Sequence, residues 1–356
     1  MLPPTPNPIL GTALHAIGAG SAALCYAPQR YLHKWSWQTY WLVQASACWF
    51  ILPWIFAWFT IPELSAVLHE APGAAMWKSY LLGALYGVGG IAFGIAIRHI
   101  GFSLTYALAI GISCVLGTLL PPILAGTLGD TLSSTAGLYV VAGVVLGGGA
   151  MIVTGLAGFR KERELAGDAA NKSFNPRLGL PIVLLAGVLS AVFNFSLQAA
   201  APIAEIAAKH GAGHFQGNVI YLFSNSGAFT TTLFYTGWLA SRAGTWGELF
   251  RTADGTGLFR NYLLSILTGL LWYLQFFFYG LGHVRMGRFE FSSWAIHMII
   301  LIFLSCGFGV AIGEWKKCQP TTKLMVTVSI ALLLGAVGMI SYGNYLATPP
   351  VAVAAH

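Results

Sequence analysis

Long, nearly uninterrupted apolar stretches follow one another along the whole chain, separated by short polar turns. A helix that crosses a lipid bilayer needs ~20 mostly apolar residues, and ten stretches meet this requirement. They lie at 8–27, 37–60, 76–97, 102–126, 134–157, 179–201, 218–241, 260–282, 289–313 and 322–345. The pattern therefore predicts an all-α integral membrane protein with ten transmembrane helices.

Composition excludes a soluble globular protein. Of the 356 residues, 56% are hydrophobic and only 8% are charged, whereas about a quarter of an ordinary soluble domain is charged. The 43 glycines fit helices that pack closely in lipid. The net charge of +7 comes from Lys and Arg that occur singly or in pairs between apolar runs. We therefore expect the lipid bilayer, and not nucleic acid, as the surrounding partner. Nothing in the pattern specifies an oligomeric state.

The positions of Lys and Arg predict the orientation. Fourteen of the 18 lie in the odd-numbered loops, between spans 1/2, 3/4, 5/6, 7/8 and 9/10, and four lie in the even-numbered loops. Basic residues are retained on the cytoplasmic side of a membrane. Both termini are therefore expected outside the cytoplasm.

An internal repeat becomes visible when residue 81 is aligned with residue 263. Leu81, Leu82, Leu85 and Gly87 then meet Leu263, Leu264, Leu267 and Gly269. With five spans in each half, the second half must enter the membrane inverted, as in many secondary transporters. This gives a five-helix repeat at 1–158, a polar cytoplasmic linker at 159–178 and a second five-helix repeat at 179–356. Because Leu and Gly are common in this chain, a chance match is the alternative.

Signatures of catalysis are weak. Residues 18–23 fit a loose dinucleotide fingerprint, which needs a preceding strand and not an apolar helix. His210 and His214 could pair on a metal, but the glycines between them argue against a helix and no third ligand is evident. All three aspartates lie in loops. We therefore predict no catalytic residue, metal site or cofactor.

Polar residues inside the spans are more informative, because each is costly in hydrocarbon unless it is paired or faces a cavity. They are His15, Gln44, Asn194, Gln198, Asn225, Gln275 and His297. All except Gln44 and Gln198 fall roughly 8–13 Å below the external surface at 1.5 Å per residue. This common depth predicts a pocket wall. The alternative is that each side chain bonds a neighbouring helix, with a contribution of about 0.6 kcal/mol.

Histidine changes charge near neutral pH, and no Asp or Glu lies deep within a span. Proton coupling would therefore use His15 or His297, or a carboxylate at a membrane edge. The two edge candidates are Glu205, near the end of the sixth span, and Glu290, at the start of the ninth. A structural role is the alternative for each.

The eighth span is dense in aromatic residues, and Trp294 follows it closely. Aromatic faces that point inward can pack on a sugar ring while amides reach its hydroxyls. The substrate-binding candidates are Gln275, Trp272, Tyr273, Asn194, Gln198, Asn225 and Trp294.

Several runs of residues carry a resemblance to a known family. The longest is Trp-Tyr-Leu-Gln-Phe-Phe-Phe-Tyr-Gly at 272–280, followed by Gly282-His283, Ser293-Trp294, His297-Met298 and Glu314-Trp315. Earlier runs are Cys25-Tyr26-Ala27-Pro28, Lys34-Trp35-Ser36-Trp37 and Ile51-Leu52-Pro53-Trp54, together with His15. With these runs the sequence resembles the L-rhamnose/proton symporter family.

The resemblance implies the ten-helix, five-plus-five fold of the drug/metabolite transporter superfamily. It also implies import of L-rhamnose, or L-lyxose, with protons as the coupling ion, across the bacterial inner membrane. An exporter or exchanger of another small metabolite on the same fold is the alternative among transporters. A membrane-embedded enzyme or sensor is the alternative outside them.

Overall fold

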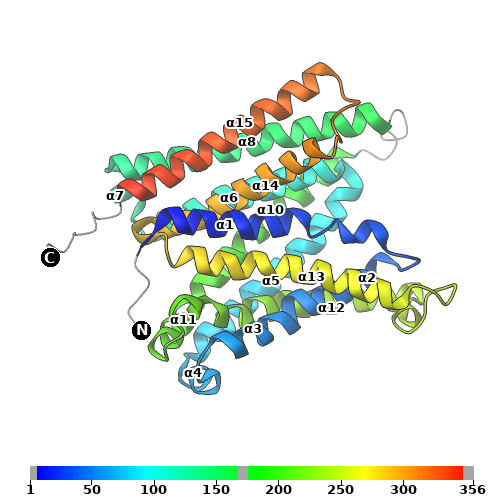
Figure 1. Cartoon of the computed structure of the whole chain (residues 1–356), viewed down its shortest axis with the longest axis horizontal. Coiled ribbons are helices and arrows are strands. Elements are labelled where there is room, and N and C mark those ends of the chain that lie inside the picture. The colour runs from blue at the N-terminus through cyan, green and yellow to red at the C-terminus, as the bar shows by residue number, and fades with distance from the viewer. Residues whose placement is uncertain (1–5, 167–174, 348–356) are drawn as a thin grey trace.

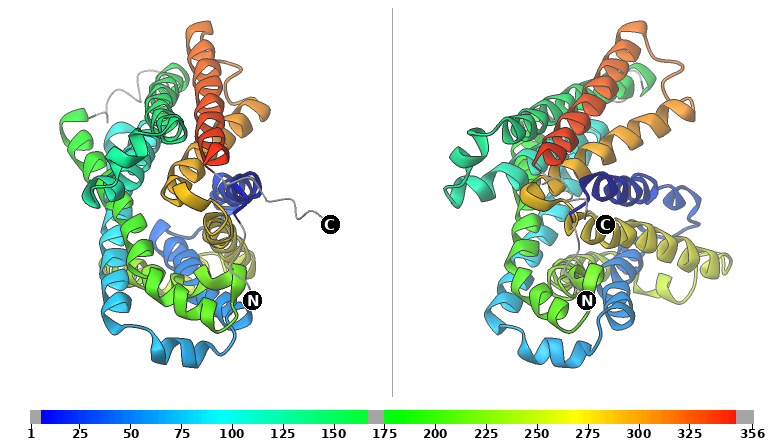
Figure 2. Two further views of the ribbon diagram at one scale, coloured as in Figure 1. Left: turned by 90° about the vertical axis from the view of Figure 1, so that its left-hand side faces the viewer. Right: turned by 60° about the vertical axis from the view of Figure 1, so that its left-hand side comes forward.

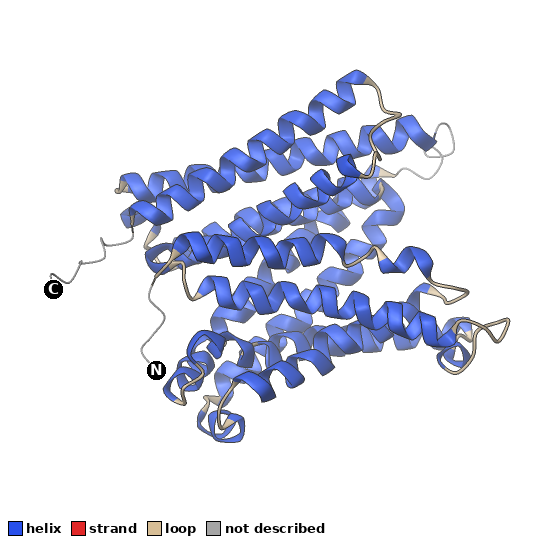
Figure 3. Ribbon diagram, viewed as in Figure 1, coloured by secondary structure: helices blue, strands red, loops and turns tan. Residues whose placement is uncertain are grey.

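The computed structural model describes residues 6–166 and 175–347, and within these ranges every regular element is a helix (Figures 1 and 3). The long helices are α1 (Pro8–Leu24), α5 (Gly73–Ile100), α6 (Phe102–Leu124), α8 (Thr135–Ala166), α10 (Pro176–Ala199), α12 (Tyr221–Ala243), α13 (Leu258–His283), α14 (Ser293–Ala311) and α15 (Pro320–Leu346). Shorter elements are η1 (Pro28–Tyr31), α2 (Trp37–Ala45), η2 (Ser46–Ile51), α3 (Leu52–Thr60), α4 (Leu64–Glu70), α7 (Leu128–Leu132), α11 (Ala201–Lys209), η3 (Gly213–Val219), η4 (Trp246–Leu249) and η5 (Gly287–Ser292). The five cysteines are buried and free.

Within the described residues, eight helical segments are long and apolar enough to cross a membrane. The multi-pass membrane protein that the sequence predicts is therefore confirmed. Of the ten predicted spans, the two without such a segment correspond to α1 and α12. The first has only 17 residues, and the second carries polar residues such as Asn225 along its 23.

The second predicted span is one continuous crossing built from α2, η2 and α3. Its middle turn is a π-helix, in which the N–H of Leu52 donates a hydrogen bond to the carbonyl of Ala47. Pro53 follows immediately and has no N–H to give to the turn before it. The wide turn accommodates the proline without ending the crossing.

The helices pack in a pattern that repeats between the two halves of the chain. Helix α1 lies against α13 and α14, and α10 lies against α5 and α6. The last long helices of the two halves, α8 and α15, pair along one edge of the bundle (Figure 2). Each half therefore inserts its first helix between the third and fourth helices of the other half.

Two glycines, one in each half, permit further close crossings between the halves. A Cβ on Gly87 of α5 would lie 2.9 Å from the carbonyl oxygen of Ala228 on α12. A Cβ on Gly269 of α13 would lie 2.7 Å from the carbonyl oxygen of Gln44 on α2. Real Cβ atoms do not approach so closely, so both crossings depend on the missing side chain. These are the two glycines that the sequence repeat aligns.

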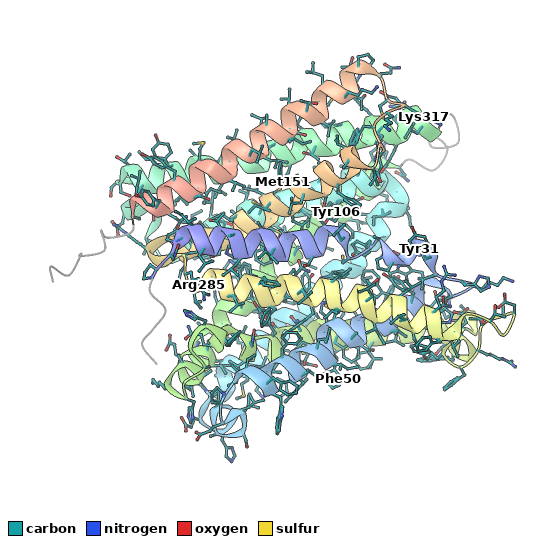
Figure 4. The ribbon with its side chains drawn as sticks, viewed as in Figure 1. Tyr31, Phe50, Tyr106, Met151, Arg285 and Lys317 are labelled. Atoms are coloured by element: carbon teal, nitrogen blue, oxygen red, sulfur yellow. The ribbon has the colours of Figure 1, made fainter. Side chains whose placement is uncertain are left out.

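The odd-numbered loops meet at one end of the bundle, and the even-numbered loops meet at the other. At one end, His33 contacts Asp254 at 2.6 Å and Lys161 pairs with Glu314 at 2.9 Å. We call it the basic end, because the loops rich in Lys and Arg gather there. At the other, the distal end, the N–H of Asn7 donates to the carbonyl of Arg285. Figure 4 labels Lys317 and Arg285 at these opposite ends, with Tyr106 between them.

One helix continues further than the sequence predicts. The fifth span was expected to end at residue 157, with a linker over 159–178, but α8 runs to Ala166. Its polar last turns are held by neighbours, because Glu162 accepts the N–H of Ser103 and Glu164 accepts the hydroxyl of Thr322. Residues 167–174 of the predicted linker lie outside the described residues, and α10 begins at Pro176.

Candidate functional site

A cavity lies between the two halves of the bundle, midway along it. About 980 Å³ of space is free of protein atoms there, part of it open to solvent. Side chains from α1, α2, η2, α5, α6, α10, α13 and α14 form its lining. A space of this size, closed on most sides by helices of both halves, is typical of a binding site for a small molecule.

Aromatic side chains dominate this central cavity. The ring of Trp272 lies 5.4 Å from Tyr26, 5.7 Å from Trp41 and 5.5 Å from Trp49, measured between ring centroids. Elsewhere in the lining, Phe193 lies 6.2 Å from Trp294. Flat apolar faces arranged around a small space suit the faces of a pyranose ring.

Few polar groups reach into the aromatic lining. Gln275 is 8% exposed and His297 is 2% exposed, and both line the cavity. The hydroxyl of Ser113 also lines it and has no hydrogen-bond partner among the described residues. Buried polar groups are normally hydrogen-bonded, so these positions fit a ligand that supplies donors and acceptors of its own.

A proline in α6 explains one of two polar contacts that hold this helix beside the cavity. Pro121 lacks the N–H that would bond the carbonyl of Gly117 one turn earlier. The side-chain amide of Asn194 donates to that freed carbonyl at 2.6 Å. One turn further back, the indole of Trp294 donates to the carbonyl of Ser113 at 3.0 Å. Helix α6 is thereby held at the cavity wall by α10 and α14.

Three histidines surround one tyrosine beside the cavity. The ring of Tyr279 lies 5.2 Å from His15, 5.6 Å from His297 and 5.7 Å from His283. His15 and His297 are themselves 5.9 Å apart. Both ring nitrogens of His15 are buried without a hydrogen-bond partner within the described ranges. The cluster joins α1, α13 and α14.

Two larger cavities extend the central one toward the ends of the bundle. The distal cavity has about 1710 Å³ of free space and shares Leu197 and Tyr279 with the central lining. The basic-end cavity has about 1290 Å³ and shares Tyr26 and Tyr106. The three cavities therefore form a row through the bundle, and these four side chains separate them.

Charged groups outside the spans pair across the loops. Hydrogen bonds with Glu70 and Glu63 raise the pKa of His210, which joins α4 to the end of α11. At the basic end, the hydrogen bond with His33 lowers the pKa of Asp254. Both ring nitrogens of His210 thus contact carboxylates. Among the described residues, no group of three or more His, Cys, Asp or Glu could hold a metal ion.

Known proteins match nearly the whole chain. The family model described as L-rhamnose-proton symport protein (RhaT) matches residues 6–346. The L-rhamnose-proton symporter of Mannheimia succiniciproducens is 33% identical over 333 residues, covering 91% of this chain and 95% of that protein. The proteins of the same name from Cronobacter sakazakii and Yersinia pestis are 32% and 31% identical, and each covers 94% of this chain. The two comparisons cover 97% and 98% of those proteins.

The chain belongs to the L-rhamnose-proton symport protein family. The resemblance found in the sequence is therefore confirmed. The family is one of sugar-proton symporters, which are transporters and not enzymes.

The site residues predicted from the sequence lie in different parts of the structure. Gln275, Trp272, Trp294 and His297 line the central cavity. Asn194, Gln198, Glu205 and Glu290 line the distal cavity. His15, Tyr273 and Asn225 are buried but line none of the three cavities. The structure thus places Gln275 and His297 in the lining of the central cavity, whereas the other polar residues of the predicted pocket wall lie outside that lining.

Sequence reasoning missed the contribution of the first half. Trp41, Trp49, Tyr86 and Tyr106 line the central cavity together with the aromatic eighth span. The second span offered a signal, because it carries several tryptophans, two of which face inward. Helices α5 and α6 each bring isolated tyrosines, and no pattern within one span distinguishes these from interfacial tyrosines. His283 was also missed as a candidate for proton coupling.

Proposed function

We propose that this chain imports L-rhamnose together with protons, and that L-lyxose is a second substrate. The family match over residues 6–346 carries this proposal. The aromatic central cavity supports it, because its flat apolar walls and few polar groups suit a deoxy sugar, which has both an apolar face and hydroxyls.

The proposed architecture has ten transmembrane helices in two inverted five-helix repeats, at 1–158 and 179–356. Helix α1 and helix α12 supply the spans beyond the eight long apolar segments. The reciprocal packing of α1 with α13 and α14, and of α10 with α5 and α6, supports this assignment. So do the equivalent close crossings at Gly87 and Gly269.

The proposed location is the bacterial inner membrane, with both termini in the periplasm. The excess of Lys and Arg in the loops of the basic end supports this orientation. In this orientation the distal cavity opens to the periplasm and the basic-end cavity opens to the cytoplasm. Sugar would enter through the first and leave through the second, as in alternating access.

In the central cavity, Trp272 and Trp294 present ring faces to the sugar, and the amide of Gln275 bonds its hydroxyls. Asn194 and Gln198 lie on the path from the periplasm, in the distal cavity. Tyr273 and Asn225 are buried behind the lining of the central cavity, which they support. The aromatic walls pack on the apolar face of the sugar, and such packing depends little on direction. The few polar groups therefore set which hydroxyls are recognised.

Proton coupling is assigned to His15 and His297, with Glu290 and Glu205 in the distal cavity as the groups that meet protons first. His297 lines the central cavity and lies 5.9 Å from His15. Two histidines so close repel each other when both are charged, so a proton on one opposes a proton on the other. A neutral imidazole is also far less costly to bury than an ionised carboxylate.

Uptake of labelled L-rhamnose by proteoliposomes, at about pH 6 and about pH 8 outside, tests the proposal. A proton gradient directed inward should drive accumulation, and adding sugar to de-energised vesicles should make the outer medium more alkaline. Proton movement in the opposite direction would favour an exporter or exchanger on the same fold. Sugar binding without sugar accumulation or proton movement would contradict the symport proposal.

A further inference from the structure

Tyr279 occupies the boundary between two cavities. It lies one helical turn after Gln275 on α13, and its side chain lines both the central cavity and the distal cavity. Its exposed fraction is 5%, so the ring fills the space between them. A side chain in this position must move before sugar can pass between the periplasmic opening and the central cavity.

The same ring is the meeting point of the buried histidines. His15 of α1, His297 of α14 and His283 of α13 all lie within 5.2–5.7 Å of its centroid. His283 stacks on it with an angle of only 12° between the rings. A protonated imidazole within about 6 Å of an aromatic ring is attracted to that ring. Protonation of the cluster therefore favours the observed position of Tyr279.

Other ionisable groups around the ring belong to neighbouring elements. The carboxylate of Glu290 on η5 acts electrostatically on both Tyr279 and His283. Tyr221 of α12 lines the distal cavity together with Tyr279. Arg288 and Glu205 line the distal cavity further out. Glu290 also lines the distal cavity, at the side from which protons would arrive.

We propose that Tyr279 is the positioning residue that couples the proton to the sugar, because its ring closes the distal side of the central cavity while packing on the three histidines. This inference rests on the proposed symport function. Sugar contacts the ring from the central cavity, and a proton holds the ring through the histidines. Both ligands thus stabilise one position of a single side chain. Each ligand then raises the affinity for the other by the same factor, as linkage requires.

The test compares Tyr279→Leu, Tyr279→Phe and the wild type in proteoliposomes. For each we would measure L-rhamnose affinity at about pH 6 and about pH 8, sugar exchange between equal concentrations, and sugar-driven proton uptake. The wild type should bind sugar several-fold more tightly at the lower pH. Tyr279→Leu should bring this ratio to about one and lose proton-driven accumulation while exchange continues. Tyr279→Phe should restore the pH dependence, because it keeps the ring.

Phe277→Leu is the matched control. It removes an aromatic ring from the same helix, but Phe277 packs on Phe56 and Phe215 and lines none of the three cavities. The control should keep the pH dependence of sugar binding. If Tyr279→Leu does not insert, Tyr279→Met gives the same test with an unbranched side chain.

The outcomes separate the two proposals. A wild type without sugar-driven proton uptake overturns the symport function itself. A wild type that couples normally, together with a Tyr279→Leu or Tyr279→Met variant that keeps the pH dependence, overturns the role of Tyr279 alone. Loss of the pH dependence in Tyr279→Phe as well overturns the ring–histidine explanation.

Discussion

Gln275 is the side-chain amide that reaches into the central cavity from the aromatic stretch of α13. Trp272 and Phe276 line the same wall, one on either side of it along the helix. This amide is therefore well placed for a hydrogen bond to a sugar hydroxyl. The aromatic neighbours exclude water that would compete for the same hydrogen bond.

Replacing Gln275 with Leu should weaken L-rhamnose binding roughly tenfold or more. The substitution leaves a sugar hydroxyl unpaired in a buried site, which costs about 1–3 kcal/mol. Isothermal titration of the purified variant measures the effect. Gln216→Leu, which alters an amide in the distal cavity, serves for comparison. Unchanged binding by Gln275→Leu would assign this amide a structural role.

His15→Asn should keep sugar exchange between equal concentrations and abolish proton-driven accumulation. Asparagine retains a polar side chain of similar size near the backbone, but it cannot take up a proton near neutral pH. His297→Asn should behave in the same way, with some loss of affinity, because His297 also lines the central cavity. If accumulation survives in both variants, the proton must use another group such as Glu290 or Glu205.

At the scale of elements, the crossing of α1 and α13 depends on glycine. A Cβ on Gly282 would lie 2.9 Å from the carbonyl oxygen of Gly11 and 3.0 Å from Nε2 of His15. The two helices therefore touch through their backbones beside the buried histidine. The position of His15 follows from this close contact.

Gly282→Ala should separate α1 from α13, displace His15 and reduce both the thermal stability and proton-driven uptake. The new methyl group meets backbone on one side, which cannot rotate away. Gly149→Ala on α8 is the control, because a Cβ there meets no atom within 4 Å. It should leave transport unchanged and, at an interior helical position, should not lower stability. Equal behaviour of the two variants would contradict the close-crossing explanation.

A second element contact depends on pH. His210 links α4 and α11 through Glu63 and Glu70, and these partners raise its pKa. A raised pKa in the folded protein means that the contact stabilises most below the unfolded value of about 6.5. This contribution disappears as the pH rises through the folded pKa.

His210→Asn should therefore lower the melting temperature at about pH 5.5 and leave it nearly unchanged at about pH 8.5. Thermal unfolding followed by tryptophan fluorescence measures both values. His69→Asn, an exposed histidine on the same α4, is the control. A pH-independent effect of His210→Asn would show that the contact does not require the charged imidazole.

At the scale of the whole molecule, the row of three cavities runs from one end of the bundle to the other. The first and last described long helices, α1 and α15, begin and end at the same side of the bundle (Figure 1). This arrangement fits an even number of crossings, and the basic loops gather at the opposite end. Orientation in the membrane then decides which cavity receives sugar and which one releases it.

A periplasm-dependent reporter fused after His356 should be active, and the same reporter placed in the linker near Gly167 should be inactive. The reason is the difference between 14 basic residues in the odd-numbered loops and 4 in the even-numbered ones. A cytoplasm-dependent reporter at both positions provides the reciprocal measurement. Cytoplasmic activity after His356 would reverse the proposed direction of transport.

Much of the fold could be predicted because the bilayer imposes its own length on each helix. Eight of the predicted spans reappear as long apolar helices, and the extent of α13 differs from the predicted span by about two residues. The end of α8 could not be predicted, because Glu162 and Glu164 stabilise its polar turns through partners in α6 and α15. Those partners are distant in the sequence.

The sequence by itself determined the number of apolar stretches, the uneven distribution of Lys and Arg among the loops and the position of each polar residue along its stretch. Only the tertiary structure decided which of these residues share a cavity, because depth along a helix does not specify rotation about its axis. His15 and Gln275 have similar depths, yet only Gln275 lines the central cavity. Asn194 bonds a carbonyl that Pro121 leaves free on another helix. Such a contact exists only once the helices have packed together.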